Sequence, residues 1–449
     1  MTQTWQSRSP SSNGSHPREA TLAELDRSEE REIETQLHQR LIRELDDGAL
    51  RRVEPEMRRE TVERAVRTLA ADHFPSLVGD LKEEVIAHVV DEVIGLGPIE
   101  PLLRDPSISE IMVNGPHDVY YERDGIIYES EVAFADDAHV MRIIDRIVSS
   151  LGRHVDEASP MVDARLADGS RVNVIIPPLA PKSPVITIRK FRRDRLTVED
   201  LVSIGTMTDG LASLLGACVQ AKLNIVISGG TGSGKTTLLN ALSAYLPHTD
   251  RIVTIEDPLE LRLQQRHVVA LEARPPSLEG RGEVTQRDLL RNSLRMRPDR
   301  IIVGEVRGME AFDMLQAMNT GHEGSLTTVH ANSPRDALGR IENMVLMAGF
   351  DLPIAAIREQ ISSALHVIVQ LTRLADGTRR VVNVTEIAGM EGPVVTLQDI
   401  FVFRQEGIDR NGKVLGELKA TGIRPQFTDR LHAFGVDVAD DVFDVARWS

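Results

Sequence analysis

Gly229-Gly230-Thr231-Gly232-Ser233-Gly234-Lys235-Thr236 satisfies the pattern G-x-x-x-x-G-K-S/T and decides the fold. The glycines of this pattern let successive backbone N–H groups turn inward around phosphate oxygens, and the loop opens a helix whose positive end favours an anion. Lys235 is expected to reach the β- and γ-phosphates of ATP, and the Thr236 hydroxyl to ligate Mg²⁺. Thr237 completes the predicted nucleotide-binding stretch. The alternative interpretation is a glycine-rich turn without a ligand.

Short β-branched runs alternate with helical stretches on both sides of this loop, which predicts parallel strands joined by crossover helices. The expected strands are Asn224–Ser228, Arg251–Ile255, Arg300–Val303 and Leu326–His330. A helix is expected over Thr236–Tyr245, and a hairpin turning at Asp376-Gly377 over His366–Leu371 and Arg379–Glu386. Helix starts are expected at Thr285, with Asp288 as its capping-box partner, and at Ser333-Pro334.

Two carboxylates stand where apolar strands end, at the edge where α/β sheets bind ligands. Glu305 follows Ile301-Ile302-Val303-Gly304 and is the Walker B candidate, which would hold Mg²⁺ through water or polarise the attacking water. Glu256 lies in the acidic stretch Thr254–Glu260 and would activate a water near the γ-phosphate, which requires the ionised carboxylate. The alternatives are an ordinary acid at the end of a strand and a surface turn at Pro258.

Two histidines flank the strand expected at Leu326–His330. Either His322 or His330 could sense the γ-phosphate, although a lone histidine is more often structural. A metal-binding pair is not expected, because no third ligand lies at helical spacing.

Arg189-Lys190-Phe191-Arg192-Arg193-Asp194-Arg195 is a basic run at an expected domain boundary. Three interpretations remain open: the run is a solvated linker, it binds nucleic acid, or it supplies arginines to the γ-phosphate from the neighbouring domain.

The chain upstream of the core divides into three further parts. Residues 1–20 are expected to be a disordered tail, 21–96 a helical domain, 97–195 an α+β domain, and 196–449 the ATPase domain with a C-terminal extension. The helical stripes are Leu37, Leu41, Ile42 and Leu45, and then Val85, Val89, Val93 and Leu96. The α+β elements are strands at Ile108–Val113 and Val185–Phe191, hairpins at Val119–Ile127 and Arg165–Ile176, and a helix at Val140–Leu151. The segment after Gly389 has no clear assignment.

Composition narrows the functional classes. Of 449 residues, 41% are hydrophobic, and 52 Lys and Arg oppose 68 Asp and Glu, a net charge of −16 that disfavours nucleic-acid binding. Cys218 is the only cysteine, which excludes an intrachain disulfide and a thiolate zinc cluster. Neither a signal-peptide core in Met1–Ala20 nor an apolar run of about 18 residues is present, so a cytoplasmic location is expected.

Taken together, these stretches resemble the ATPase superfamily that powers type II secretion, type IV pili and type IV secretion. The resemblance runs from about Gly95 to Glu386. It rests on Gly97-Pro98-Ile99-Glu100-Pro101-Leu102-Leu103, Ile108-Ser109-Glu110-Ile111-Met112-Val113-Asn114-Gly115, the Walker A loop, the Asp box Thr254–Glu260, Arg295-Met296-Arg297-Pro298-Asp299, Gly304-Glu305-Val306-Arg307 and the His box Thr320–Asn332. It implies a RecA-like P-loop core with a parallel sheet, preceded by an α+β (PAS-like) domain and a small helical domain.

The resemblance also implies an oligomeric state and roles for individual residues. The protein would be a homo-hexamer whose active sites lie between the two larger domains, near a subunit interface. Arg171 and Arg189 match the γ-phosphate arginines of the family, Glu256 the catalytic carboxylate, Glu305 the Walker B acid and His330 the His-box histidine. Lys235 is expected to be essential for turnover.

The branch that it resembles most is the CpaF family of tight-adherence (Flp) pilus ATPases, because of Arg281-Gly282-Glu283-Val284-Thr285 and the long helical N-terminus. That branch implies inner-membrane platform proteins as partners at the cytoplasmic face of the membrane. The general-secretory branch, which usually has a four-cysteine zinc module, is disfavoured by the single cysteine.

Two other functions compete with a motor. A nucleotide-gated scaffold would bind ATP and recruit partners with negligible turnover, against which the intact Glu256 and Glu305 argue. A nucleic-acid motor would be stimulated by DNA or RNA, against which the acidic charge argues.

Overall fold

In a computed structural model, the chain forms two compact units, Met1–Phe191 and Arg192–Ser449. The structure describes residues 32–34, 36–38, 40–41, 53–123, 125–149, 154–191, 196–276 and 281–445. The expected disordered tail 1–20, the stripe residues Ile42 and Leu45, the turn residue Asp124, the helix end at Leu151 and the basic residues Arg192–Arg195 lie outside the described residues.

The first unit begins with helices that pack on one another. α3 (Pro55–His73) and α4 (Gly79–Ile94) contact each other, and the short helices η1 (Gly97–Ile99) and α5 (Glu100–Arg104) follow them. The two predicted stripes meet in one apolar cluster, because Leu37 and Leu41 pack with Val85 and Val89. These four side chains are almost fully buried, as expected for the inner faces of amphipathic helices.

A six-stranded antiparallel sheet forms the rest of the first unit, in the order β3-β2-β1-β6-β5-β4. Its strands are β1 (Ile108–Val113), β2 (Val119–Arg123), β3 (Ile126–Glu129), β4 (Met161–Arg165), β5 (Arg171–Ile175) and β6 (Val185–Arg189). The helix α6 (Asp137–Ser149) packs Ile143 and Ile147 into the same core as Val172 and Ile188. An α+β unit is therefore confirmed.

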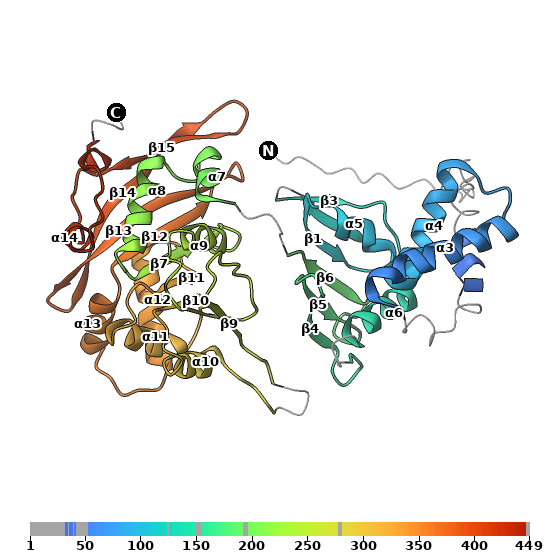
Figure 1. The fold of residues 1–449 in the computed structure, drawn as a ribbon, viewed down its shortest axis with the longest axis horizontal. Coiled ribbons are helices and arrows are strands. Elements are labelled where there is room, and N and C mark those ends of the chain that lie inside the picture. Colours follow the sequence, from blue (N-terminus) through green and yellow to red (C-terminus); the bar gives the residue numbers. More distant parts are fainter. Residues whose placement is uncertain are drawn as a thin grey trace, which may run out of the picture. The chain divides into compact units, whose positions relative to one another are not determined.

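The second unit is built on a nine-stranded sheet in the order β15-β14-β13-β12-β7-β11-β10-β8-β9 (Figure 1). The strands from β12 to β9 are parallel: β7 (Ile225–Gly229), β8 (Ile252–Glu256), β9 (Val268–Glu272), β10 (Arg300–Val306), β11 (Leu326–Val329) and β12 (Val367–Arg373). The four core strands predicted from sequence are all present, and they are parallel as predicted.

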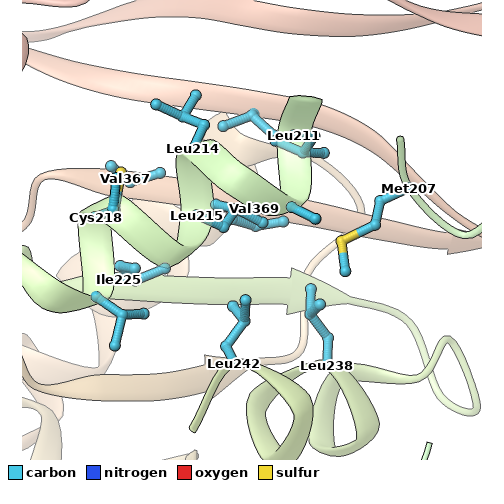
Figure 2. Packing of buried hydrophobic residues seen from close by; sticks show 14 of the residues in the cluster. Met207, Leu211, Leu214, Leu215, Cys218, Ile225, Leu238, Leu242, Val367 and Val369 are labelled. Atoms are coloured by element: carbon cyan, nitrogen blue, oxygen red, sulfur yellow. The ribbon is translucent and has the colours of Figure 1, made fainter. Parts of the chain in front are cut away.

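Helices cover both faces of this sheet. α7 (Val198–Ser203), α8 (Asp209–Gln220) and α9 (Lys235–Ser243) lie on one face, and α10 (Gln286–Ser293), α11 (Glu310–Asn319), α12 (Pro334–Met347) and α13 (Ile354–Ala364) on the other. Successive side chains of β7 belong to different cores. Ile225 and Ile227 pack in the core that contains α8 and α9, and Val226 packs in the core that contains α11 and α12. Figure 2 shows Ile225 between α8 and α9, with Leu215 and Leu242 approaching from the two helices. This is the three-layer arrangement of a RecA-like α/β core.

Local sequence signals place two helix starts correctly. Thr285 and Asp288 form the predicted capping box at α10, and the Ser333 hydroxyl accepts a hydrogen bond from Asp336 N at the start of α12. Each cap satisfies N–H groups that the first helical turn leaves unpaired.

Among the described helices, none combines the length and apolar character that crossing a bilayer requires.

The segment after Gly389, which the sequence left unassigned, extends the sheet. The predicted hairpin of His366–Leu371 and Arg379–Glu386 is present as β12 and β13 (Arg379–Glu391). Beyond it, β14 (Val394–Ile408) and β15 (Val414–Ala420) continue the sheet as antiparallel strands, and α14 (Thr428–Ala433) and η2 (Asp440–Phe443) come after them. Phe401 of β14 and Leu431 of α14 belong to the same buried cluster as α8. The C-terminal extension is thus part of the core of the second unit.

Candidate nucleotide-binding site

The glycine-rich loop connects β7 to α9 at the carboxyl edge of the parallel sheet. Gly232 and Gly234 have φ values of +68° and +96°, which residues with a Cβ rarely adopt. The N-terminus of α9 has no side-chain cap within the described part of the chain, and the first N–H groups of any helix lack a partner inside the helix. A Cβ at Gly230 or Gly232 would meet open space, which leaves room on the loop. These features fit a phosphate group.

The Lys235 side chain folds back along this loop. Its Nζ donates to Gly229 O and to Gly230 O, both at 3.0 Å, and Ser233 Oγ donates to Gly230 O at 2.9 Å. The ammonium group therefore lies beside the loop backbone, within reach of any anion that the loop holds. Binding of the β- and γ-phosphates by this lysine stays a prediction of the motif.

Oxygen ligands suited to Mg²⁺ gather beside the loop. Thr236 Oγ1 donates to Glu260 Oε2 at 3.2 Å, which adds a carboxylate that the sequence analysis did not select. The signal was available, because Glu260 is the third acid of the stretch that begins at Glu256. No group of three or more His, Cys, Asp or Glu among the described residues could hold a metal alone. Proteins usually hold Mg²⁺ through one or two carboxylates together with substrate phosphates.

Glu256 ends β8 and is only 2% exposed. Its Oε2 accepts hydrogen bonds from Glu260 N at 2.6 Å and Leu261 N at 2.8 Å, whereas Oε1 is buried with no partner among the described residues. Burial raises the pKa of Glu256 and outweighs the two backbone hydrogen bonds, which lower it. A Cβ at Gly304 would lie 2.8 Å from Glu256 Cγ, so the glycine of β10 makes room for this carboxyl group.

Glu305 and His330 approach Lys235 from the two strands between β7 and β8. Burial acts to raise the pKa of Glu305, but the pKa is lowered overall by Arg307, whose Nη2 lies 2.9 Å from Oε2, and by Lys235 and His330. Burial lowers the pKa of His330, and the nearby charge of Lys235 lowers it further. A carboxylate and a neutral imidazole thus stand together beside the cation of the loop.

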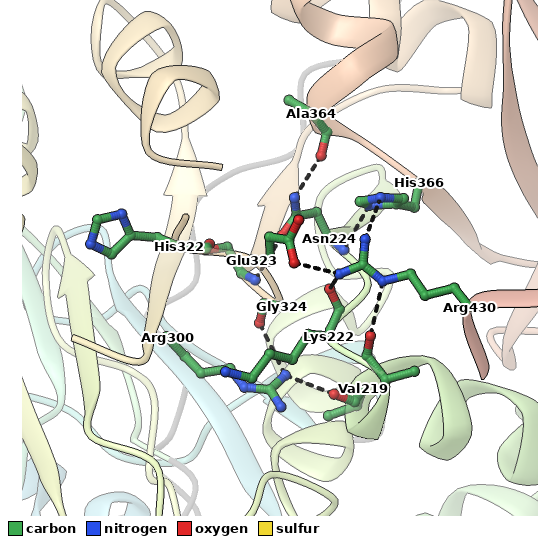
Figure 3. A network of polar contacts seen from close by, with 12 residues as sticks. Val219, Lys222, Asn224, Arg300, His322, Glu323, Gly324, Ala364, His366 and Arg430 are labelled. Atoms are coloured by element: carbon green, nitrogen blue, oxygen red, sulfur yellow. Dashed lines mark hydrogen bonds and ion pairs between the residues drawn. The ribbon is translucent and has the colours of Figure 1, made fainter. Parts of the chain in front are cut away.

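His322 lies at the other edge of the sheet. β11 is parallel to β7, with Leu326 opposite Ile225, so a residue before Leu326 stands where β7 begins and not where the loop follows. Figure 3 shows His322 in this region with Asn224 and Arg430. The prediction that His322 could sense a γ-phosphate is therefore wrong for the loop of its own chain, and of the two histidines the structure brings only His330 to that loop.

The two arginines matched by resemblance belong to the first unit. Arg171 of β5 pairs directly with Arg189 of β6, and Arg189 Nε lies 3.8 Å from Glu110 Oε1. Residues paired in this way project from the same face of a sheet. Two cationic side chains therefore stand side by side there.

Two glutamines that the sequence analysis missed connect the strands of the site. Gln370 of β12 is buried, and its Nε2 donates to Ala331 O, next to His330, at 3.1 Å. With its amide oriented to satisfy both neighbours, Gln286 donates to Glu305 O at 3.0 Å and accepts from Asp257 N at 3.3 Å. A polar residue inside the apolar run Val367–Leu371 was the available signal for Gln370.

Comparison with known proteins gives consistent matches. The family model described as "Type II/IV secretion system protein" matches residues 92–415. A Mycobacterium tuberculosis protein whose name refers to conjugal transfer is 37% identical over 327 residues, covering 71% of this chain and 92% of that protein. The type IV secretion system protein VirB11 of Bartonella henselae is 33% identical over 335 residues, with coverage of 66% and 92%. The crystal structure of the VirB11 ATPase from Brucella suis is 32% identical, covers 64% of this chain and 94% of its own, and has a TM-score of 0.36.

Proposed function

The chain belongs to the type II/IV secretion system protein family, and we propose that it hydrolyses ATP as the motor of such a system. One observation carries the proposal. A phosphate-binding loop, two carboxylates and a histidine come from four neighbouring parallel strands and gather at one edge of the sheet. Ligands of open α/β sheets bind at this edge.

The roles follow from the surroundings of each side chain. The loop amides and Lys235 would hold the β- and γ-phosphates, and Thr236, Glu260 and Glu305 would hold Mg²⁺ directly or through water. The metal ion would neutralise charge that develops on the phosphate oxygens. Glu256 would accept a proton from the attacking water at Oε1, the oxygen that has no partner among the residues described. His330 would contact the γ-phosphate.

Arg171 and Arg189 would supply further positive charge. Arg171 and Arg189 are directly opposite each other on β5 and β6, which would let both guanidinium groups contact one anion. We propose that these arginines bind the γ-phosphate and release it after hydrolysis. A contact made with ATP and lost with ADP gives the two nucleotides different preferences between conformations, which a motor requires.

The system is proposed at two levels. The names of the matched relatives refer to conjugal transfer and type IV secretion, which supports a motor of a secretion or pilus apparatus. The finer proposal is a homo-hexamer of the CpaF type that drives tight-adherence pilus assembly, or protein secretion, at the cytoplasmic face of the inner membrane through a platform protein. The stretch Arg281–Thr285 supports this branch. No nucleic-acid partner is proposed, since the net charge is −16.

The test is Mg²⁺-dependent phosphate release by the purified full-length chain, with oligomer size measured in the same samples. Lys235→Ala should abolish turnover, and Lys182→Ala, which removes an exposed lysine of the first unit, should leave it unchanged. Tight ATP binding without turnover in the wild type would favour a scaffold, and stimulation by DNA or RNA would favour a nucleic-acid motor. Full activity of Lys235→Ala would refute the assigned site.

A further inference from the structure

Arg379 contacts the phosphate-binding loop from a part of the chain that has no nucleotide motif. It is the first residue of β13, and its Nε donates a hydrogen bond to Gly232 O at 2.8 Å. A Cβ built on Gly234 would lie 3.5 Å from Arg379 Cδ, so the arginine stem runs along the loop. A guanidinium group is therefore in direct contact with the backbone that would surround the phosphates.

The hairpin that delivers Arg379 is held firmly in place. Leu371 of β12 pairs with Gly229, so β12 continues past the start of the loop to Arg373, which pairs with Arg379 across the hairpin. In the turn, Asp376 accepts hydrogen bonds from Thr378 N at 3.0 Å and from Val414 N of β15 at 2.8 Å. The side chain that reaches Gly232 thus projects from a supported turn at the end of a sheet.

The side of the loop that Arg379 occupies indicates which part of a nucleotide it meets. Glu256, Glu305 and His330 come from β8, β10 and β11, which all lie on one side of β7 in the sheet. The hairpin of β12 and β13 lies on the other side of β7. If the first group surrounds the γ-phosphate, a cation on the opposite flank lies nearer the part of the nucleotide that ATP and ADP share.

We propose that Arg379 is a nucleotide-binding residue whose positive charge attracts the α- and β-phosphates of both ATP and ADP. The inference rests on the proposed ATP site. The hydrogen bond from Nε holds the guanidinium group of Arg379 against the loop. The positive charge of Arg379 there adds to that of Lys235, which also contacts the loop backbone. Arg379 therefore contributes to affinity for both nucleotides, whereas the γ-phosphate groups distinguish between them.

The experiment separates the charge from the hydrogen bond. Arg379→Gln keeps an N–H donor for Gly232 O and removes the charge, and Arg379→Lys keeps the charge. Arg404→Gln removes an exposed arginine of β14 in the same sheet and is the matched control. Binding of MgADP and of Mg²⁺ with the slowly hydrolysed analogue ATPγS is measured by calorimetry on the full-length chain, and thermal melting without nucleotide checks folding.

Arg379→Gln should weaken both nucleotides equally, roughly tenfold, the weight of one charge-assisted contact that is partly exposed. Arg379→Lys should stay within about threefold of the wild type and Arg404→Gln should match it, because the charge near the loop is kept. Unchanged affinity in Arg379→Gln, or a loss confined to ATPγS, would overturn the inference.

Lys235→Ala in the same assay tests the proposed ATP site separately from the role of Arg379. If Lys235→Ala loses binding and Arg379→Gln does not, the ATP site stands and only the role of Arg379 fails. If neither variant loses affinity, the proposed site fails as well.

Discussion

Acid should destabilise the second unit through His366, whose imidazole is held neutral at the edge of the sheet opposite the phosphate-binding loop. His366 Nδ1 accepts a hydrogen bond from Asn224 N at 3.0 Å, and Nε2 lies 3.4 Å from Arg430 Nη1 (Figure 3). Protonation would turn Nδ1 into a donor facing a backbone N–H and would place a second cation beside Arg430. The neutral form is therefore the one that the fold accepts.

The size of the effect follows from the two pKa values. Burial, and then the charge of Arg430, lowers the pKa of His366 from 6.5 to about 4. At 1.36 kcal/mol for each pKa unit, this difference corresponds to about 3 kcal/mol. The unfolded chain binds the proton first as the pH falls, so the contribution is complete above pH 6.5 and is lost as the pH approaches about 4.

The assay is urea unfolding at a series of pH values, followed by hydrogen exchange of the β7 and β12 amides, which report on the second unit. His366→Asn keeps an acceptor for Asn224 N but cannot titrate, so the difference between wild type and variant isolates the histidine from other acid-sensitive groups. The wild type should lose about 3 kcal/mol more than the variant between pH 7.5 and pH 4. Parallel losses in the two proteins would refute the reasoning.

Other predictions concern the site and its support. Glu256→Gln should slow phosphate release by roughly 10²- to 10⁴-fold with nucleotide affinity nearly unchanged, as measured by turnover and calorimetry. Because burial raises the pKa of Glu256 and its ionised form is required, turnover in a pH–rate profile should fall in acid at a higher pH than an ordinary glutamate would give. Gln370→Leu, which releases Ala331 O, should lower kcat more than it raises KM in steady-state kinetics. Arg300→Met, which removes a fully buried partner of Asp250, Val219 O and Gly324 O, should cost about 3–5 kcal/mol in urea unfolding.

Local pattern was sufficient for the core of the second unit. The strand before the loop, the helix after it and the three further parallel strands all follow from apolar runs bounded by turns, because a strand buried on both faces tolerates little else. Helix caps were equally local, as at Thr285. The direction of the predicted strand was also enough to choose between His322 and His330 as the one near the nucleotide, since only His330 follows the carboxyl end of β11.

The parts that the sequence did not predict depend on distant contacts. Arg379 and Gly232 are 147 residues apart, and Gln370 and Ala331 are 39 apart, so no periodicity or spacing links them. The strands after Gly389 depend on β13, because β14 pairs with the edge of β13 and β15 pairs in turn with β14. Glu260 was visible as an acid, but its approach to Thr236 depends on how the chain turns after β8.

Contacts from two arginines late in the chain lie at the two ends of β7, the strand that carries the phosphate-binding loop. At its end, Arg379 of β13 holds Gly232 O. Just before its start, Arg430 of α14 donates to Ala221 O at 3.1 Å and Lys222 O at 3.0 Å. β13 and α14 therefore contact the chain on both sides of β7 and restrain the strand that carries the loop at both of its ends. A segment without any nucleotide motif is in this way part of the physical basis of the nucleotide site.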